Sequence, residues 1–334
     1  MIKVHCFVSC VCEIIKRTPG VDHRPFYFGV WDADFSLSER YRISYHSEHT
    51  GHEFFKTWYE LLYGIRIHEW YDRAASKAEN LEHLITLVET RAEHRHIMVM
   101  LDLYHLPERE NKFNQNPFPH YVMLQATEDP EEWLMLDPDF RWEGRLPKDQ
   151  ILNAVAQPTV AGGFYFDGID ITHSSADTIR AYFAQCMKRE ANPLTDAVRQ
   201  MIRAHIAGEN DLTLSDLNLA MRELPVLSIR KYAYEHAFAW FYEALSLPWD
   251  EFEDWCDVIE LLVKTYRLIQ YRSMKMVMTG DVSQAAELYQ LLDQQDNTEF
   301  RIKNGLQSLF EDWSRRSLQL SAHPTVTERT ETCR

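Results

Sequence analysis

The sequence predicts an α+β fold, with helices and antiparallel strands in the first half of the chain and helices alone in the second half. Two observations carry this prediction. Short apolar stretches flank a polar turn at residues 127–130, as the strands of an antiparallel hairpin do. After about residue 174, apolar residues recur three and four positions apart, which is the spacing of amphipathic helices. We therefore expect two lobes, at 1–172 and 173–320, and a flexible polar tail at 321–334.

The predicted elements follow along the chain. A first helix is expected from Cys6 to about Lys16, where Pro19 and Gly20 would end it. The rest of the first half should contain helices at 51–63 and 75–90, and strands at 96–104, 120–126, 133–137 and 163–171. The second half should contain helices at 177–188, 195–207, 214–223, 229–245, 249–271, 284–292 and 299–318.

Composition narrows the class of partner. The chain has 334 residues with 51 acidic and 35 basic side chains, a formal net charge of −16 at pH 7. This charge argues against nonspecific binding to nucleic acid or to anionic membranes, and it favours a cationic partner such as a polyamine. The alternative is that the acidity serves solubility alone. Because no apolar run reaches the length of a membrane helix and no signal peptide is evident, we expect a cytoplasmic protein.

The cysteines do not form a disulfide framework. Three of the six lie together near the start of the chain and the others are scattered, so we expect all of them to be reduced. Structural zinc would need further cysteine or histidine pairs at suitable spacing, and none stands elsewhere in the sequence. We therefore predict no metal site.

Three residues together indicate nucleophilic catalysis. Cys6 opens the predicted first helix, a position that favours the thiolate. His120 starts a predicted strand, and Asp137 ends the next one 17 residues later, so a hairpin would bring the imidazole and the carboxylate together. A thiolate, a base and a residue that orients the base form a catalytic triad. We predict these roles for Cys6, His120 and Asp137, with Cys10 as an alternative nucleophile.

The same motifs resemble known families. A histidine that opens an apolar strand, followed by an Asp-Pro at the end of the next, is similar to the pattern of papain-like and bacteriocin-processing cysteine peptidases. The order of motifs resembles the butirosin-type acyl-carrier-protein:aminoglycoside acyltransferases at residues 5–6, 28–29, 101–107 and 119–122. Across nearly the whole chain, the sequence resembles the aryl transferases of petrobactin biosynthesis, with matching stretches at 4–10, 28–35, 106–113, 136–144 and 229–238.

This resemblance implies a papain-like lobe and a helical lobe that completes the acceptor pocket. It implies an acyltransferase that moves a 3,4-dihydroxybenzoyl group from an aryl carrier protein thioester, through an acyl-Cys6 intermediate, to a primary amine of spermidine or citryl-spermidine in siderophore biosynthesis. The phosphopantetheine arm would arrive with the carrier protein, so no bound cofactor is expected. The alternatives are a cysteine peptidase or amidase with the same triad, and a non-catalytic module that binds carrier protein or polyamine. A homodimer is left open.

The oxyanion donors are incompletely assigned by the resemblance. Peptidases of this type often carry a glutamine upstream of the cysteine, and none lies among the five residues before Cys6. The backbone N–H of Cys6 is one candidate donor. The second donor is unassigned, with His5, Asn111 and Gln115 as weak candidates.

A polyamine would be bound by carboxylates and aromatic faces. The candidate substrate-binding residues are Trp31, Asp32, Asp34, Asp102, Glu110, Asp139, Glu235 and His236. Asp102 interrupts an apolar strand and is equally well explained as a structural partner. His236 has the alternative role of a hydrogen-bonded core histidine. Scattered arginines are weak candidates for contacts with an acidic carrier protein, at positions 40, 42, 141 and 145.

Overall fold

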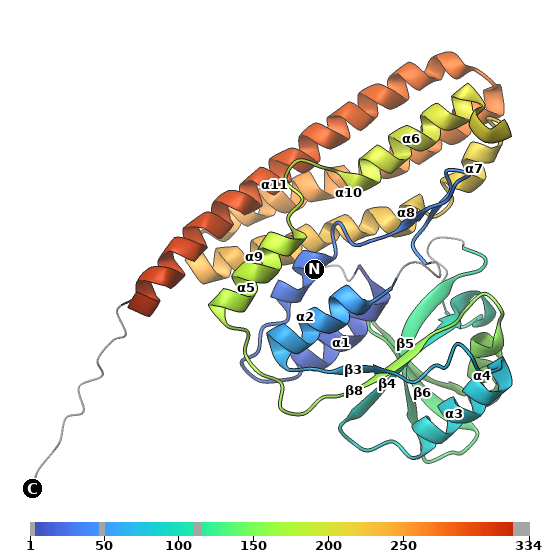
Figure 1. Ribbon diagram of the computed structural model, residues 1–334, viewed down its shortest axis with the longest axis vertical. Coiled ribbons are helices and arrows are strands. Elements are labelled where there is room, and N and C mark those ends of the chain that lie inside the picture. The colour runs from blue at the N-terminus through green and yellow to red at the C-terminus, as the bar shows by residue number, and fades with distance from the viewer. Residues whose placement is uncertain (1–3, 47–50, 110–114, 323–334) are drawn as a thin grey trace, which may run out of the picture.

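The computed structural model describes residues 4–46, 51–109 and 115–322. A sheet with helices on both faces forms the first half of the chain, and a layer of long helices lies across one side of it (Figure 1). This arrangement confirms the predicted α+β class and the all-helical second half. The predicted boundary at 172/173 falls between the last strand, β8 (Gly163–Asp167), and the first helix of the second half, α5 (Ala176–Cys186).

The main sheet has six strands in the order β3-β8-β4-β5-β6-β7, and all neighbours are antiparallel. Besides β8, its strands are β3 (Ile67–Glu69), β4 (Arg95–Asp102), β5 (Pro119–Ala126), β6 (Glu132–Asp137) and β7 (Trp142–Pro147). A separate two-stranded sheet pairs β1 (Ser36–Leu37) with β2 (Ile43–Ser44). The sequence missed the edge strands β3 and β7, because β3 has three residues and β7 alternates exposed side chains with two half-buried ones and the buried Leu146.

Alternate residues of the central strands belong to two cores. Met98 and Met100 of β4 join the core that contains α1 (Cys6–Lys16), whereas Val99 and Leu101 join the core on the other face. This second core is covered by α3 (Lys77–Glu89) and α4 (Lys148–Ala156), and α2 (Glu53–Tyr63) lies near α1 on the first face (Figure 1). The alternation is the expected result of side chains pointing to opposite faces of a strand.

Helix α1 lies between the sheet and the helical layer (Figure 1). Most of its side chains are fully buried, including Phe7, Val11 and Ile15, which explains why its sequence is apolar on more than one face. The chain then turns at Gly20, whose φ of 80° suits glycine. A 3₁₀ helix, η1 (Arg24–Gly29), carries the chain to the helical layer. Another, η2 (Leu103–His105), follows β4.

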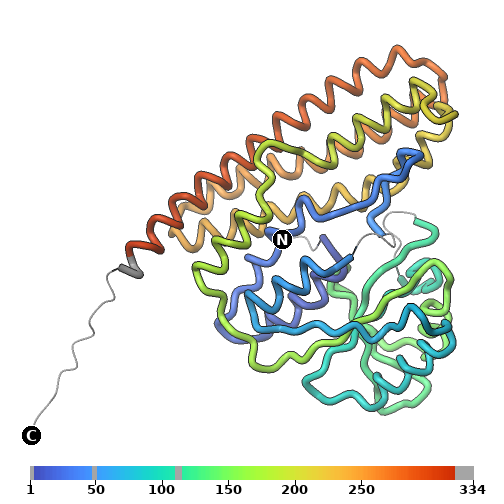
Figure 2. The backbone as a smooth tube through the Cα atoms, viewed as in Figure 1, coloured from blue at the N-terminus to red at the C-terminus, as the bar shows by residue number. Residues whose placement is uncertain are grey.

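The second half consists of helices joined by short turns. Besides α5 they are α6 (Pro193–Ala207), η3 (Glu209–Asp211), α7 (Asp216–Ala220), α8 (Leu224–Ser228), η4 (Ile229–Tyr232), α9 (Ala233–Leu245), α10 (Trp249–Thr279), η5 (Val282–Gln284) and α11 (Ala285–Ala322). Helices α10 and α11 run side by side as a long hairpin (Figure 2). Two helices predicted at 284–292 and 299–318 are one helix, since the polar residues between them remain helical. Among these, buried Gln295 donates to the Leu262 carbonyl.

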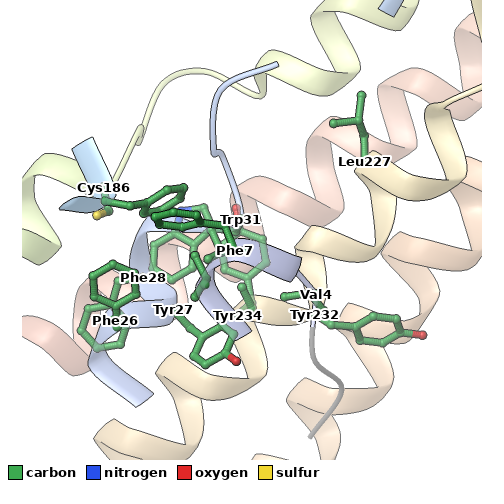
Figure 3. Packing of buried hydrophobic residues seen from close by; sticks show 14 of the residues in the cluster. Val4, Phe7, Phe26, Tyr27, Phe28, Trp31, Cys186, Leu227, Tyr232 and Tyr234 are labelled. Atoms are coloured by element: carbon green, nitrogen blue, oxygen red, sulfur yellow. The ribbon is translucent and has the colours of Figure 1, made fainter. Parts of the chain in front are cut away.

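Aromatic rings and buried charges join the first half to the helical layer. The rings of Phe26, Phe28 and Trp31 extend from the η1 segment into the core, where Trp31 stacks on Tyr234 of α9 with centroids 4.8 Å apart (Figure 3). Buried carboxylates then pair with buried lysines across the same junction. Lys231 binds Asp32 at 2.7 Å and Glu299 at 2.6 Å, and Lys303 binds Asp32 at 2.8 Å. We call these four residues the junction cluster: Asp32, Lys231, Glu299 and Lys303.

Candidate active site

Cys6 is the first residue of α1, and one carboxylate fixes the start of this helix. Asp139, in the turn between β6 and β7, accepts a hydrogen bond from the His5 N–H at 3.1 Å and from Ser9 Oγ at 2.8 Å, both through Oδ1. His5 is the N-cap residue and provides no side-chain cap. Asp139 therefore ties the N-cap residue and the first turn of α1 to the β6–β7 turn, which holds Cys6 beside the start of β5 and the end of β6.

His120 and Asp137 come together as the hairpin spacing predicts. His120 is the second residue of β5 and Asp137 is the last of β6, the neighbouring strand. His120 Nε2 lies 3.0 Å from Asp137 Oδ1, and both side chains are buried. The same oxygen accepts the Phe140 N–H at 3.2 Å, and the Phe140 ring stacks on the imidazole with centroids 5.0 Å apart. The orientation of the imidazole is thus fixed by a carboxylate and an aromatic face.

Arg109 completes the surroundings of Asp137. Its guanidinium lies 2.6 Å from Asp137 Oδ2, and it also packs 4.2 Å from the ring centroid of Trp142. Sequence reasoning missed this residue, although it lies in the stretch 106–113 that carries the resemblance to the aryl transferases. A buried arginine beside a buried carboxylate is the kind of pair that low-dielectric surroundings require.

The electrostatics of the site favour the charged form of His120. Burial alone would lower the pKa of His120, but the charge of Asp137 and the charge and hydrogen bond of Cys6 raise this pKa well above 6.5. Burial would likewise raise the pKa of Asp137, yet His120 and Arg109 lower it below 3.8. Burial raises the pKa of Asp139 above 3.8, with His120 opposing the shift. The charged imidazole of His120 therefore has one N–H directed at the Asp137 carboxylate and a second N–H on its other ring nitrogen.

Cys6 and His120 border a pocket with about 540 Å³ of empty space, part of which is open to solvent. Its walls are largely apolar and include Met100, Phe118 and Phe140. The helical layer contributes Val226, Ile229 and Arg230, so both halves of the chain form this pocket. Arg230 is another residue that sequence reasoning missed, because nothing in its local pattern relates it to Cys6 more than 200 residues away.

A second cavity of about 690 Å³ of empty space adjoins the first. The two share three lining residues, His5, Tyr45 and His52. Two of the predicted substrate-binding residues, Asp32 and Asp34, border this second cavity. Asp34 is exposed, whereas both carboxylate oxygens of Asp32 bind lysines of the junction cluster.

Of the other predicted binding residues that the structure describes, only Asp139 borders the Cys6 pocket. Trp31 is stacked in the core, and Asp102 accepts the Phe118 N–H at 2.8 Å and the Thr159 hydroxyl at 2.9 Å. His236 stacks on Tyr27 at 3.8 Å and borders a hollow on the far side of Asp137. Glu235, also on α9, is buried and interacts with Glu260 and Cys256 of α10. Glu110 lies outside the described residues.

The remaining candidates are placed as follows. Cys10, the alternative nucleophile, is fully buried with its thiol 3.7 Å from the Tyr121 carbonyl oxygen. Of the suggested oxyanion donors, His5 borders the Cys6 pocket, whereas the Gln115 amide donates to the Arg222 carbonyl at 3.1 Å. Asn111 lies outside the described residues. The suggested carrier-protein contacts are dispersed, with Arg40 and Arg42 in one surface hollow, Arg141 in another and Arg145 paired with Glu128.

Neither a metal centre nor a membrane helix is found in the part of the chain that the structure describes. Within residues 4–46, 51–109 and 115–322, no group of three or more metal-ligating side chains comes together. Over the same ranges, no helix has both the length and the apolar character to cross a bilayer.

Comparison with known proteins identifies the family. The model of the DUF6005 N-terminal domain matches residues 1–171, and that of the DUF6005 C-terminal domain matches residues 177–327. The chain is 46% identical over 312 residues to a curated Bacillus anthracis protein named petrobactin synthase, with 93% of this chain and 95% of that protein covered. This match confirms the resemblance inferred from the sequence motifs. The chain therefore belongs to the DUF6005 family and is a relative of that petrobactin synthase.

Proposed function

We propose that this chain is an acyltransferase of petrobactin biosynthesis, a siderophore pathway. It takes a 3,4-dihydroxybenzoyl group from its thioester on an aryl carrier protein, holds the group on Cys6, and passes it to a primary amine of spermidine or citryl-spermidine. One observation carries the proposal: the buried His120–Asp137 pair lies beside Cys6 in a relative of a petrobactin synthase. The phosphopantetheine arm belongs to the carrier protein, so the chain itself needs no bound cofactor for these steps.

The fold supports a papain-like arrangement for the first half. A cysteine at the start of a buried helix faces an antiparallel sheet, and neighbouring strands of this sheet supply the base and the carboxylate. In such a site the helix start and the imidazolium favour the thiolate. A cytoplasmic location, where the thiol stays reduced, suits this chemistry.

The first step transfers the acyl group to the protein. The Cys6 thiolate attacks the thioester carbonyl, and the tetrahedral intermediate places negative charge on the carbonyl oxygen. The bond to the carrier's sulfur then breaks, and that sulfur leaves as a thiol with the proton of the His120 imidazolium. The products are an acyl-Cys6 thioester, a neutral imidazole and the free carrier thiol. The backbone N–H of Cys6 at the start of α1 is a suitable donor to the oxyanion.

The second step transfers the group to the acceptor. The neutral primary amine attacks the acyl-Cys6 carbonyl, a C–N bond forms, and His120 accepts the proton that the amine loses. The bond between carbon and the Cys6 sulfur breaks, and the thiolate returns beside the imidazolium. Asp137 keeps the imidazole oriented through both steps and balances its charge in the second.

The two cavities suit the two substrates. Met100, Phe118 and Phe140 give the Cys6 pocket a wall on which an aromatic acyl group can pack. The adjoining cavity has an exposed carboxylate, Asp34, at its border, and Asp139 faces the Cys6 pocket itself. Carboxylates placed along this path attract a polyamine, and the helical layer encloses it.

The test is to mix the purified chain with the 3,4-dihydroxybenzoyl-loaded carrier protein, with and without spermidine. Without acceptor, intact-mass analysis should show one 3,4-dihydroxybenzoyl adduct that peptide mapping places on Cys6. With spermidine, the adduct should disappear as the amide forms. Cys6→Ala should give neither adduct nor amide, whereas Cys256→Ala, which changes a half-buried cysteine on α10, should behave as the wild type.

Each other outcome favours a different function. Free 3,4-dihydroxybenzoate as the sole product, in the presence of spermidine, would indicate a hydrolase such as a peptidase or amidase. An adduct that persists in Cys6→Ala would identify another nucleophile. Binding of carrier protein or spermidine without any adduct or product would indicate a non-catalytic module.

A further inference from the structure

Arg230 brings a buried positive charge from the helical layer into the Cys6 pocket. It lies in η4, in the turn that leads into α9, and is 6% exposed. It borders the pocket together with Cys6 and His120. A guanidinium in this position needs an explanation, since burying a charge is costly unless other groups compensate it.

The bonding of Arg230 leaves donors free for the pocket. Nη1 donates to the carbonyls of Ala33 at 3.3 Å and Asp34 at 3.0 Å, and Nη2 donates to the Tyr45 carbonyl at 3.4 Å. A guanidinium has five N–H groups, so these three bonds do not satisfy all of them. Among the described residues, no carboxylate lies within salt-bridge distance of Arg230, although Asp139 and Asp34 act on it from farther away. Burial lowers the pKa of Arg230 to about 10, which still leaves it charged at neutral pH.

Few of the groups around Cys6 carry charge at neutral pH. The pKa of His120 is raised by Asp137 and Cys6, Arg230 stays charged, and burial raises the pKa of Asp139. Burial lowers the pKa of His46 to about 4 and that of His52 to about 3. Burial is also the largest cause that lowers the pKa of His5 well below 6.5. Burial raises the pKa of both tyrosines in the pocket wall well above 10, and these are Tyr45 and Tyr121.

These charges pair as follows. His120 and Arg109 both form ion pairs with the same carboxylate, that of Asp137. Among the described residues that border the pocket, Arg230 is then a cation without a carboxylate in contact, and Asp139 acts on it from farther away. A thiolate on Cys6 would give it a counterpart within the same pocket.

We propose that Arg230 stabilises the negative charge of the Cys6 sulfur, so that the helical layer supplies an electrostatic part of the active site. Arg230 is a positioning residue in this view, since it acts through Cys6. The proposal deepens the proposed function and rests on Cys6 being its nucleophile. It explains why an arginine held by three carbonyls of the 33–45 segment projects into a pocket whose reacting groups come from the first half.

The test uses iodoacetamide, which reacts with thiolates and requires neither carrier protein nor amine. Alkylation of Cys6 would be followed by intact mass and peptide mapping from pH 5 to about 10, in the wild type and in Arg230→Gln, Arg230→Met and Arg230→Lys. Loss of a nearby positive charge should move the pH midpoint of alkylation upward by about one unit or more in the two neutral variants. It should also slow alkylation at pH 7 about tenfold. Arg230→Lys should keep the midpoint within about half a unit of the wild type, because the charge remains.

Matched measurements separate charge from structure. Arg24→Gln removes another largely buried guanidinium, which binds Asp22 and Glu243 away from Cys6, and should leave the alkylation profile unchanged. Thermal unfolding of every variant reports on the carbonyl contacts independently of the thiol. A profile in Arg230→Gln or Arg230→Met that matches the wild type would overturn the proposal, as would equal shifts in the lysine and neutral variants. If neither neutral variant folds, a shift of about one unit or more in Arg230→Lys would overturn it alone. Failure of acyl transfer with normal alkylation would instead count against the proposed function.

Discussion

His120 and Arg109 bind opposite oxygens of the same buried carboxylate. His120 Nε2 lies 3.0 Å from Asp137 Oδ1, and Arg109 Nη2 lies 2.6 Å from Oδ2. With Nε2 turned toward Asp137, the imidazole has Nδ1 left to interact with Cys6, which raises the pKa of His120. The carboxylate therefore decides which ring nitrogen faces the sulfur, and the arginine decides how the carboxylate is held.

Replacing Asp137 with asparagine should remove the charge that stabilises the imidazolium while keeping the shape of the side chain. Acyl transfer should fall by about 10² to 10⁴ in kcat, with a smaller effect on KM. Steady-state kinetics with the loaded carrier protein and spermidine would measure both. Asp129→Asn, in the exposed turn between β5 and β6, is the control and should retain wild-type kinetics. A loss in Asp137→Asn of less than about tenfold would contradict the role given to this residue.

Arg109→Gln should both destabilise the fold and weaken the site, because it leaves Asp137 buried with one cation fewer. Removing one partner of a buried pair costs about 3 kcal/mol in the free energy of unfolding, measurable by urea titration. Arg145→Gln breaks an exposed pair with Glu128, 3.3 Å apart, and should cost less than about 1 kcal/mol.

The acid side of the stability curve gives Arg109→Gln a second readout. The pKa of Asp137 is lowered in the folded protein, so its stabilising contribution is present above the unfolded pKa and is lost as pH falls. Without the arginine this pKa should rise toward its unfolded value, so the loss of stability should be smaller and should end at a higher pH than in the wild type. Identical acid unfolding curves for Arg109→Gln and the wild type would show that the arginine does not hold the carboxylate in its ionised form.

The position of Cys6 at a helix start and the contact between His120 and Asp137 could be predicted from sequence, because both depend on local rules. Cys6 opens a helix that its own residues and Gly20 delimit, and the His120 to Asp137 spacing belongs to one hairpin. Arg109 and Arg230 could not be inferred in this way. Arg109 lies in the loop that follows η2, and Arg230 lies in η4. Only the packing of segments that are distant in the sequence brings these two side chains to the site.

The elements of the fold likewise separate into those that local sequence predicts and those that depend on tertiary contacts. The central strands β4, β5 and β6 are apolar enough to be recognised, whereas the edge strand β7 and the helix α4 have mixed sequences that the sheet and its second core stabilise. By its local sequence pattern, the polar stretch between residues 292 and 299 predicts a break between two helices, yet α11 continues through it. Its residues are kept helical by partners on other helices, such as the Asp296 carboxylate that binds Asn192 and Arg199. Tertiary contacts override the local preference there.

The junction cluster should contribute strongly to stability. Lys231→Met leaves Asp32 and Glu299 buried with fewer cations, and the free energy of unfolding should fall by about 3 to 5 kcal/mol. Urea unfolding followed by circular dichroism would measure the change. Lys264→Met breaks an exposed pair with Glu260 one helical turn away and should leave the free energy of unfolding close to that of the wild type. Equal effects of the two substitutions would show that the cluster is not a significant part of the junction.

Glu235 should make the protein less stable as the pH rises toward neutrality. Burial in α9 raises the pKa of Glu235 to about 7, with Glu260 adding to the shift. Because the folded pKa is above the unfolded one, the folded state binds more protons between about pH 4.5 and 7, and stability is lost over this window as pH increases. In the Glu235→Gln variant the side chain cannot ionise, so this pH-dependent loss of stability does not occur. Its unfolding free energy should match the wild type near pH 4 and exceed it at pH 8 by about 2 kcal/mol.

Glu253→Gln, on the exposed side of α10, is the control and should follow the wild type at both pH values. A Glu235→Gln protein that is no more stable than the wild type at pH 8 would show that Glu235 ionises in the fold without cost.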